Sequence, residues 1–536
     1  MMKLRQRWLL GLIILVPSLW LSILFIAMRG GGGGFRLESE EEQINLAKIH
    51  RKVSADYSLN SDESKESSEA EREKNRRAGL PKDSTLYFVP QEHPKVPYIK
   101  VKDRRKFEAL FRDFPSSYEL PELTENDFLV RFREPQKRNK IWEKFHQGIN
   151  RYEMYSYNDS ELIETYMNYL GHTKILRARE KSGGTQVKLF LVFIDGGEAL
   201  MKPWRVPRDY ETLPDHYYFA DIERHTAEIA FFHLDRILDF RRTPPITGRI
   251  FNMTSEFYQR SDKSLGRSFF RSPANNLCFM TNCDQHCSSS ETPVCGNPDR
   301  IEGSLAAFLP PEKSAKRKSW THPFKRSYSK REKASWESDP SYCKRVVMKE
   351  HPYNSGRRLL DIIDLSILDF LSGNQDRHSY NTFHMFGNFS TIIHLDHGRA
   401  FGRYQTDEMS CLVPLIQCCV IRQSTYKRLQ ILQRNEYKLG DVMRESLSTD
   451  LIAPVLYEPH YDALNRRLDI ILVEIQKCLA AADLLEDVLK SEPSIEDYNE
   501  PEPPKEDHHN EPKIKKNTGE EEQKEIKNNV NDDFDF

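Results

Sequence analysis

The sequence lacks several features that mark common classes of protein. It has almost no net charge, with 79 Lys and Arg against 81 Asp and Glu, and its candidate strands carry no G-x-G-x-x-G phosphate loop. Cysteine is absent from both ends, because all nine cysteines lie between Cys278 and Cys478. The ends are polar and charged, whereas the middle holds the aromatic residues and the cysteines. We therefore expect the middle of the chain to be the ordered part.

The chain has 536 residues, which is more than one ordinary hydrophobic core accommodates. This length predicts one large two-lobed domain with flanking segments. We expect four parts: a signal anchor over 1–29, a disordered lumenal stem over 30–84, a domain over 85–490 and a disordered acidic tail over 491–536. The stem and the tail have too few large apolar residues to bury a core. The small lobe of the domain would extend to about residue 305.

The N-terminus combines basic residues with an apolar run. Lys3, Arg5 and Arg7 precede the 21 residues from Trp8 to Met28, which is long enough to span a bilayer. No small-x-small cleavage site follows, and the basic flank favours a cytoplasmic N-terminus. We interpret the run as a type II signal anchor, with a cleaved signal peptide as the alternative. Either one would place the remainder in the secretory lumen.

Glycosylation triplets and cysteines agree with that compartment. Asn158, Asn252 and Asn388 each begin an Asn-x-Ser or Asn-x-Thr sequon. A cysteine cluster confined to the middle of the chain is typical of a disulfide framework in an oxidising lumen.

The cysteines themselves fall into two groups. Four lie within 18 residues: Cys278, Cys283, Cys287 and Cys295. Their C-x-x-x-C spacing also suits zinc, but no second C-x-x-C pair accompanies it, so we favour disulfides. Vicinal Cys418 and Cys419 rarely bond each other, so each is expected to pair with a distant cysteine. A bridge from Cys343 to Cys418 would close about 75 residues and contribute roughly 4.5 kcal/mol.

The stretch from Gly373 to Gly402 carries the strongest chemical signal. Asn381 follows Asp376-Arg377-His378 at the D-x-x-x-x-N spacing of a protein-kinase catalytic loop. Asp396-His397-Gly398 then stands where D-F-G would, after the apolar run 392–395, which predicts a strand. Phosphoryl transfer needs one carboxylate to accept the hydroxyl proton and another to hold a divalent metal. The tripeptide alone could be a loop ion pair, but the whole arrangement predicts a kinase site.

Upstream, a hairpin pattern ends in a lysine. The apolar segment 187–194 and the segment 198–202 flank a glycine-containing turn, which predicts two strands. A kinase small lobe presents its phosphate-binding lysine in this way, so Lys202 is the candidate. Most lysines at strand ends are surface residues, which is the alternative.

Amphipathic spacing predicts helices on both sides of these motifs. The segment 221–238 contains Glu223 and Glu228, either of which could pair with Lys202, although a structural salt bridge is the alternative. The segment 359–372 would deliver the catalytic loop. Further helical patterns cover 104–114, 141–155, 425–448 and 461–489.

Two other segments invite a functional interpretation. The apolar run Ile301 to Leu309 could link two lobes and line an adenine pocket, with core packing as the alternative. The basic segment 313–333, interleaved with Trp320, Phe324 and Tyr328, could bind nucleic acid. A lumenal protein rarely meets nucleic acid, so we expect none as a partner. Attraction of an acidic protein substrate is the better interpretation, with a solvated loop as the alternative.

Five ordered motifs resemble one known family. ERHTAEIAFFHLDRIL, IEGSLAAFLP, GNQDRH, IIHLDHGRAFG and LIQCC are similar to the Golgi casein kinases, secretory-pathway kinases of the family with sequence similarity 20. The resemblance covers roughly residues 85–490. It implies an α+β, atypical two-lobed protein-kinase-like fold with a β-rich small lobe and a mainly helical large lobe, stapled by disulfides. It also implies phosphorylation of secreted proteins at Ser-x-Glu by a Golgi membrane enzyme with a lumenal domain, or by a cleaved and secreted form.

The resemblance implies roles for particular residues. It also implies that the enzyme uses ATP with Mn²⁺, or Mg²⁺, as cofactors. Asp376 would be the catalytic base, Lys202 the phosphate clamp, and Glu223 and Asp396 the metal ligands. Nucleotide contacts would come from Gln186, Lys202, Glu223, Ala306, Ala307, Phe308, Leu309, Asn381 and Asp396. The implied disulfides are Cys278 with Cys295, Cys283 with Cys287, Cys343 with Cys418, and Cys419 with Cys478. Cys411 would be free, or would bridge chains.

One departure and two alternatives accompany the resemblance. Vertebrate members have Glu where this chain has Asn381, which can still coordinate metal, so we expect activity with a changed metal preference. One alternative is a pseudokinase that activates a partner kinase, a role that goes with Gln in place of Glu223. The other is the group's xylose kinase, which the basic segment and the full cysteine set disfavour. A homodimer or a pseudokinase partner is compatible with the family.

Overall fold

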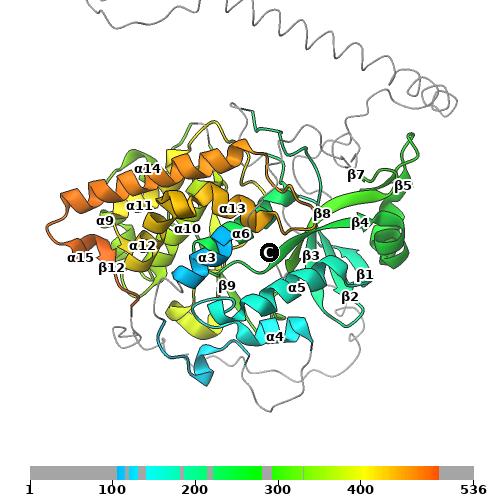
Figure 1. Ribbon diagram of the computed structural model, residues 1–536, viewed down its shortest axis with the longest axis horizontal. Coiled ribbons are helices and arrows are strands. Elements are labelled where there is room, and N and C mark those ends of the chain that lie inside the picture. The colour runs from blue at the N-terminus through cyan, green and yellow to red at the C-terminus, as the bar shows by residue number, and fades with distance from the viewer. Residues whose placement is uncertain are drawn as a thin grey trace, which may run out of the picture. The chain divides into compact units, whose positions relative to one another are not determined.

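The computed structural model describes residues 105–114, 120–130, 140–181, 186–213, 221–280, 293–329 and 331–493. These residues form an antiparallel sheet and a mainly helical part, which stand side by side in Figure 1. The predicted anchor over 1–29 lies outside the described ranges. Within them, no helix combines the length and apolar character needed to cross a membrane.

The sheet has five antiparallel strands in the order β1-β2-β3-β8-β4. In this order the strands are β1 (Ile175–Glu180), β2 (Leu189–Phe193), β3 (Glu198–Pro203), β8 (Arg300–Ala307) and β4 (Ile246–Asn252). The hairpin predicted before Lys202 is therefore confirmed as β2 and β3. Most of the apolar run from Ile301 is β8, a strand paired on both sides, and this burial accounts for its unbroken apolar sequence.

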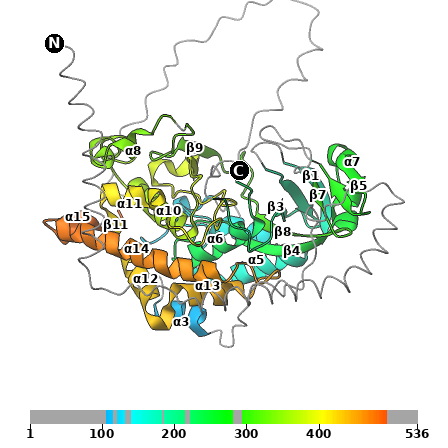
Figure 2. The same cartoon turned by 90° about the horizontal axis from the view of Figure 1, so that it is seen from above.

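The large lobe is built mainly from helices. Its longer members are α10 (Arg358–Ser372), α12 (Gln423–Gln433), α13 (Leu439–Leu447) and α14 (Pro459–Ala481), with the short α11 (Val413–Cys418) beside them. The helix predicted over 359–372 is confirmed as α10. The pattern over 425–448 proves to be two helices separated by a 3-10 turn, and the pattern over 461–489 ends as a regular helix at Ala481. Figure 2 shows α14 running along this lobe.

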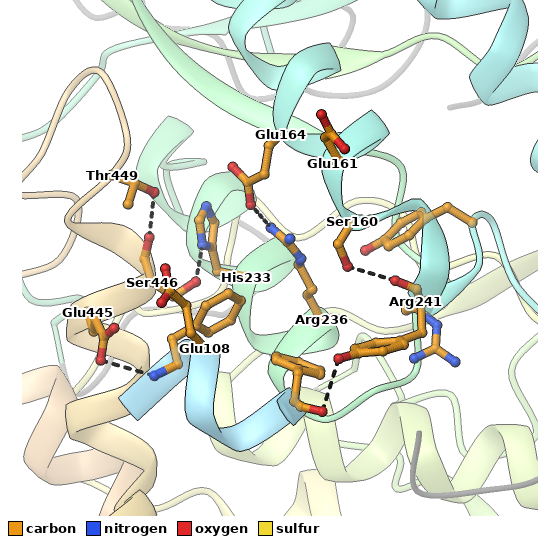
Figure 3. Close-up of a pocket in the computed structure, with 14 residues that line it drawn as sticks. Glu108, Ser160, Glu161, Glu164, His233, Arg236, Arg241, Glu445, Ser446 and Thr449 are labelled. Atoms are coloured by element: carbon orange, nitrogen blue, oxygen red, sulfur yellow. Dashed lines mark hydrogen bonds and ion pairs between the residues drawn. The ribbon is translucent and has the colours of Figure 1, made fainter. Parts of the chain in front are cut away.

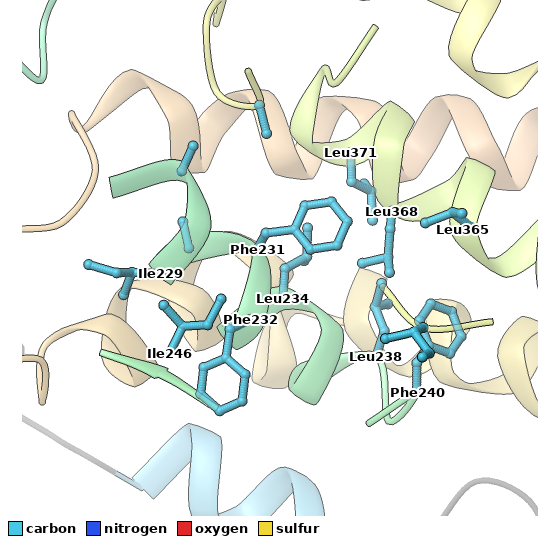
Figure 4. Packing of buried hydrophobic residues seen from close by; sticks show 14 of the residues in the cluster. Ile229, Phe231, Phe232, Leu234, Leu238, Phe240, Ile246, Leu365, Leu368 and Leu371 are labelled. Carbon is cyan, nitrogen blue, oxygen red and sulfur yellow. The ribbon is translucent and has the colours of Figure 1, made fainter. Parts of the chain in front are cut away.

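Helix α6 (His225–Ile237) lies between the sheet and the helical lobe, and every one of its residues is buried. Its apolar side chains face those of α10, as Figure 4 shows for Phe231, Leu234 and Leu368. The predicted start at residue 221 is wrong, because residues 221–224 are a non-helical entry to the helix in which the backbone of Arg224 is extended. Glu223 therefore stands in that entry segment, whereas Glu228 lies on α6.

Smaller elements complete the described chain. They are α3 (Arg105–Asp113), α4 (Ile141–Gly148), α5 (Ser160–His172), α7 (Lys263–Ser268), α8 (Ser335–Ser338), α9 (Tyr342–Arg345), α15 (Leu485–Val488), β5 (Phe269–Arg271), β6 (Leu277–Phe279), β7 (Val294–Cys295), β9 (Arg317–Thr321), β10 (Ser379–Phe383), β11 (Ile421–Arg422) and β12 (Leu489–Lys490). The helix predicted over 141–155 thus ends at Gly148. The strand predicted over 392–395 is also wrong, because only Ile393 forms a β-bridge, with Asn381. One bridge leaves the segment free to turn at Asp396.

Three of the implied disulfides are confirmed. Cys278–Cys295 joins β6 to β7, Cys343–Cys418 joins α9 to α11, and Cys419–Cys478 ties the end of α11 to α14. The implied pair Cys283–Cys287 lies outside the described residues. Cys411 is a buried thiol that forms no disulfide within the described part of the chain, and a bridge between chains stays a prediction.

Two surface predictions can be placed in the structure. Asn158 is exposed, whereas Asn252 and Asn388 are half-buried, with Asn252 accepting hydrogen bonds from Ser255 and Asn388 lying 3.1 Å from His351. Their glycosylation stays a prediction. At the C-terminal side, Glu492 is ion-paired and 7% exposed, so the packed chain continues past the expected boundary at residue 490.

Candidate active site

Three carboxylates converge on the ammonium group of Lys202 near the end of β3. Its Nζ lies 2.8 Å from Glu223, 2.5 Å from Glu228 and 3.1 Å from Asp396. Lys202 is paired with Ser304 of β8, so the sheet fixes where its side chain begins. The hypothesis that Glu223 or Glu228 would pair with Lys202 was too narrow, because both do.

Burial and charge oppose each other in this cluster. Burial alone would lower the pKa of Lys202, but Glu223, Glu228 and Asp396 raise it well above its ordinary value, so the lysine is charged. Burial raises the pKa of Glu228 despite Lys202. Burial would also raise the pKa of Asp396, yet Lys202 and then Lys188 lower it below the ordinary range. The cluster thus holds Lys202 charged and keeps Asp396 ionised.

The three carboxylates are also placed to share a cation. One oxygen from each of Glu223, Glu228 and Asp396 can be chosen so that all three lie within 4.8 Å of one another. Carboxylate oxygens are the ligands that Mg²⁺ and Mn²⁺ prefer. Asp396 has 41% of its side chain exposed, against 9% for Glu223 and 7% for Glu228. The donor set therefore fits a divalent metal that approaches from the Asp396 side.

The Asp396-His397-Gly398 turn is locked against α6 and its entry segment. The His397 N–H donates to Glu228 at 3.1 Å, and the His397 ring stacks on Phe231 with centroids 3.4 Å apart. A Cβ at Gly398 would fall 2.8 Å from that of Glu223, so the close approach requires glycine. Asp396 itself has φ of 60°, a left-handed conformation that costs free energy in a non-glycine residue. These contacts hold the strained turn and orient Asp396.

The catalytic loop leaves α10 through Gly373, whose φ of 72° ends the helix. Arg377 of this loop forms a bidentate pair with Asp369 on α10 and donates to the Leu395 carbonyl at 2.6 Å. A third contact joins Arg377 to His397 Nδ1 at 3.1 Å. Arg377 therefore connects the loop that carries Asp376 to the turn that carries Asp396.

Asp376 points toward a small set of polar groups. Its carboxylate is ion-paired with Arg399, which lies three residues beyond Asp396, and its Oδ1 is 3.5 Å from the hydroxyl of Tyr328. The side chain is 9% exposed. Neither Arg399 nor Tyr328 was predicted to reach Asp376. The spacing to the D-H-G motif could have indicated Arg399, whereas nothing local in the sequence places Tyr328 there.

The residues predicted to contact the nucleotide differ in their position relative to the Lys202 cavity. Ala306 lines a cavity together with Lys202, Glu228 and Asp396. Ala307 and Leu309 are fully buried, and the Phe308 carbonyl accepts a hydrogen bond from His146 at 2.9 Å. Asn381 lies on β10, where its backbone carbonyl accepts from Ile393 at 2.9 Å. Gln186 stands at the start of the described stretch leading to β2, and the contacts of the described residues do not join it to the Lys202 cluster.

A larger cavity, of about 440 Å³, lies among α3, α5, α6 and α13 (Figure 3). It shares no lining residue with the cavity at Lys202. Inside it, His233 is hydrogen-bonded to Ser446 at 2.6 Å, and Arg236 is paired with Glu164. Burial and Arg236 lower the pKa of His233 to about 3, so this histidine is neutral. We place the candidate chemistry at Lys202, where charged groups converge.

The site combines three parts. An antiparallel sheet presents Lys202, a helix places Glu228 in an ion pair with it, and a helical lobe supplies two Asp-containing loops. Together these parts define a protein-kinase-like fold. The comparisons with known proteins narrow this class. The model of the family "Fam20C: Golgi casein kinase, C-terminal, Fam20" matches residues 140–486. The chain belongs to the Fam20 family.

The chain is similar to several curated proteins and solved structures. Human extracellular serine/threonine protein kinase FAM20C is 56% identical over 339 residues, which cover 63% of this chain and 58% of the relative. Mouse pseudokinase FAM20A is 46% identical over 358 residues, which cover 63% and 66%. A crystal structure of the Golgi casein kinase with Mn/ADP bound matches with a TM-score of 0.65 and 37% identity, covering 75% of this chain and 96% of that one. The chain spans about three fifths of the length of the first curated kinases it matches.

Proposed function

We propose that the chain is an ATP-dependent serine kinase of the secretory pathway that phosphorylates secreted acidic proteins at Ser-x-Glu. The observation that carries this proposal is the convergence of Glu223, Glu228 and Asp396 on Lys202, next to a catalytic loop that presents Asp376. The relatives named as kinases support it, as does the Mn/ADP-bound structure.

In this proposal each charged group has a separate task. Glu223 and Asp396, with Glu228 beside them, would hold Mn²⁺ or Mg²⁺, which neutralises charge on the nucleotide phosphates when bound. Lys202, kept charged by the carboxylates, orients the phosphates of ATP. Asp376 accepts the proton of the serine hydroxyl at Oδ1, the carboxylate oxygen that faces Tyr328. Arg399 holds the other oxygen of Asp376 and so orients the carboxylate.

We also propose roles for residues that do not contact the Lys202 cluster or whose role its geometry does not define. Ala306 to Leu309 would line the adenine, Gln186 would lie near the phosphates, and Asn381 would change the metal preference through its amide. The cellular location follows the same reasoning, with a Golgi membrane anchor over 1–29 or a cleaved, secreted form. A homodimer or a pseudokinase partner would fit the family.

A pseudokinase is the second candidate, because FAM20A is also a close relative. The presence of Glu223, 2.8 Å from Lys202, favours an active kinase, since Gln at this position goes with the pseudokinase role. A xylose kinase is the third candidate and would use the same phosphoryl chemistry.

The test measures phosphate transfer from labelled ATP with Mn²⁺, using the full chain and its Asp376→Ala variant. A Ser-x-Glu peptide and a xylose-containing glycan serve as acceptors. We expect label on the peptide, lost in the variant. Label on the glycan alone would identify a sugar kinase. Nucleotide binding without transfer to either acceptor would identify a pseudokinase.

A further inference from the structure

The basic segment 313–333 is fastened beside the catalytic loop. Its strand β9 pairs with β10, which directly follows that loop, so that Trp320 stands opposite Tyr380. Beyond β9, the His322 N–H donates to the His378 carbonyl at 2.9 Å. The segment therefore borders the acceptor side of Asp376.

Several cations of this segment have structural partners within the protein. Arg317 is paired with Glu312, and Arg326 donates to the Gln375 carbonyl at 3.1 Å. Lys318 stacks on Trp320, with its Nζ 3.8 Å from the ring centroid. These contacts explain part of the basic composition without any substrate.

Lys325 is exposed, as Lys318 is, but only Lys325 of these cations packs on an aromatic ring that lies near the reacting side chain. Its Nζ stands 5.3 Å from the ring centroid of Tyr328, and the hydroxyl of that ring lies 3.5 Å from Asp376. One aromatic side chain thus separates a solvent-facing ammonium from the carboxylate that would accept the serine proton.

An extended peptide matches this spacing. Residues i and i+2 of an extended chain point to the same side and lie about 7 Å apart. A serine hydroxyl at Asp376 therefore directs the side chain two residues further along toward the same face of the enzyme. A carboxylate there can reach a lysine that stands 5.3 Å from the centroid of the ring whose hydroxyl lies 3.5 Å from Asp376.

We propose that Lys325, held over Tyr328, is a specificity-determining residue that binds an acidic side chain two positions after the acceptor serine. This inference rests on the proposed kinase function. It assigns the recognition of the acid to one exposed side chain rather than to the general charge of the basic segment.

The experiment compares two peptides that differ only in Ser-x-Glu against Ser-x-Gln, using the full chain and its Lys325→Gln variant. We expect the variant to lose about fivefold in kcat/KM for the Glu peptide, the size of one exposed ion pair, through KM. The Gln peptide should be unaffected, so the preference for Glu should fall by the same factor. Lys318→Gln, which removes a lysine that also lies on an aromatic ring, is the matched control and should keep the preference.

The outcomes separate the inference from the proposed function. If the wild type prefers the Glu peptide and Lys325→Gln keeps that preference, the inference is wrong while the kinase function stands. An equal loss for both peptides would also overturn it, because that pattern indicates a structural role. Absence of transfer to either peptide by the wild type would overturn both. Lys325→Glu sharpens the test, since it should lower activity on the Glu peptide further and raise the relative activity on a Ser-x-Lys peptide.

Discussion

Two buried charge networks in this protein differ in their balance. Around Lys202, one ammonium faces the three carboxylates of Glu223, Glu228 and Asp396. In the large lobe, three guanidinium groups face three carboxylates through a continuous set of ion pairs. Its members are Arg242, Arg357, Arg422, Asp361, Asp364 and Glu492.

In the large-lobe network, the arginines and the carboxylates neutralise one another's charge. Arg422 reaches Asp361 at 2.6 Å and Glu492 at 2.6 Å, and it is also paired with Asp364. Burial would lower the pKa of Arg422, but Glu492, Asp364 and Asp361 raise it well above its ordinary value. Among its direct ion pairs, the Lys202 cluster has three carboxylates against one ammonium, and one of its members, Asp396, is partly exposed. Excess buried charge costs stability unless a ligand compensates it, so the imbalance indicates function and the balance indicates structure.

Removing Asp396 should have the largest effect of the substitutions that test this comparison. Asp396→Ala removes a metal ligand and should lower phosphate transfer by at least about 1000-fold, because charge stabilisation at the phosphates is lost. Mn²⁺ binding, measured by electron paramagnetic resonance, should weaken as well. Asp113→Ala, which removes a carboxylate on α3 paired with Arg112, is the control and should leave transfer unchanged. Substantial transfer by Asp396→Ala would contradict the role of the cluster.

Asp376→Asn should act on chemistry without acting on the cluster. Loss of a general base should reduce kcat by about 100- to 10,000-fold, with Mn²⁺ and nucleotide binding retained. Steady-state kinetics with a nucleotide titration check both parts. A variant that keeps its kcat, or that loses nucleotide binding instead, would place Asp376 outside the proton transfer.

The balanced network should respond through stability. Arg422→Met leaves Asp361 and Asp364 with fewer partners in a buried site and should lower the free energy of unfolding by about 3–5 kcal/mol, measured by denaturant titration. Arg466→Met breaks an exposed pair with Asp407 and should cost about 1 kcal/mol or less. Equal costs for the two variants would show that burial does not distinguish these pairs.

Glu492→Gln should give a smaller change than Arg422→Met, with a defined pH dependence. Burial would raise the pKa of Glu492, but Arg422 and Arg357 lower it below its ordinary value. The stabilisation is therefore present above the unfolded pKa of about 4.3 and is lost as the pH falls through the folded value. We expect wild type to exceed the variant by about 1–3 kcal/mol at pH 7, with the gap closing in acid. A gap that persists or widens below pH 4 would contradict this sign.

Sequence spacing predicted the site only where its members are neighbours along the chain. The D-x-x-x-x-N spacing indicated Asp376, and the hairpin pattern indicated Lys202. The partner of Lys202 stayed ambiguous between Glu223 and Glu228, because one belongs to α6 and the other to its entry segment, and both reach the same ammonium. The contact of Tyr328 with Asp376 joins residues 48 positions apart, and no local pattern specifies it.

Secondary-structure predictions from hydrophobic periodicity were wrong where contacts with a distant segment of the chain set the backbone conformation. The run 392–395 has the composition of a strand, but its end is held by Arg377 and by the stacking of His397 on Phe231, so it turns at Asp396. The helical pattern over 221–238 overran the start of α6 because Arg224 donates its N–H to the Gly398 carbonyl, and this bond holds the extended Arg224 outside the helix.

The sequence by itself determined the two-lobed α+β class, the strand that carries Lys202, the helix before the catalytic loop and the family, because these depend on local periodicity and on ordered motifs. Only the tertiary structure decided that three carboxylates meet at one lysine, that a second network of arginines and acids is balanced, and that Tyr328 contacts both Lys325 and Asp376. Those relations depend on the distances between segments far apart in the chain, and charge acts through distance in space rather than along the sequence.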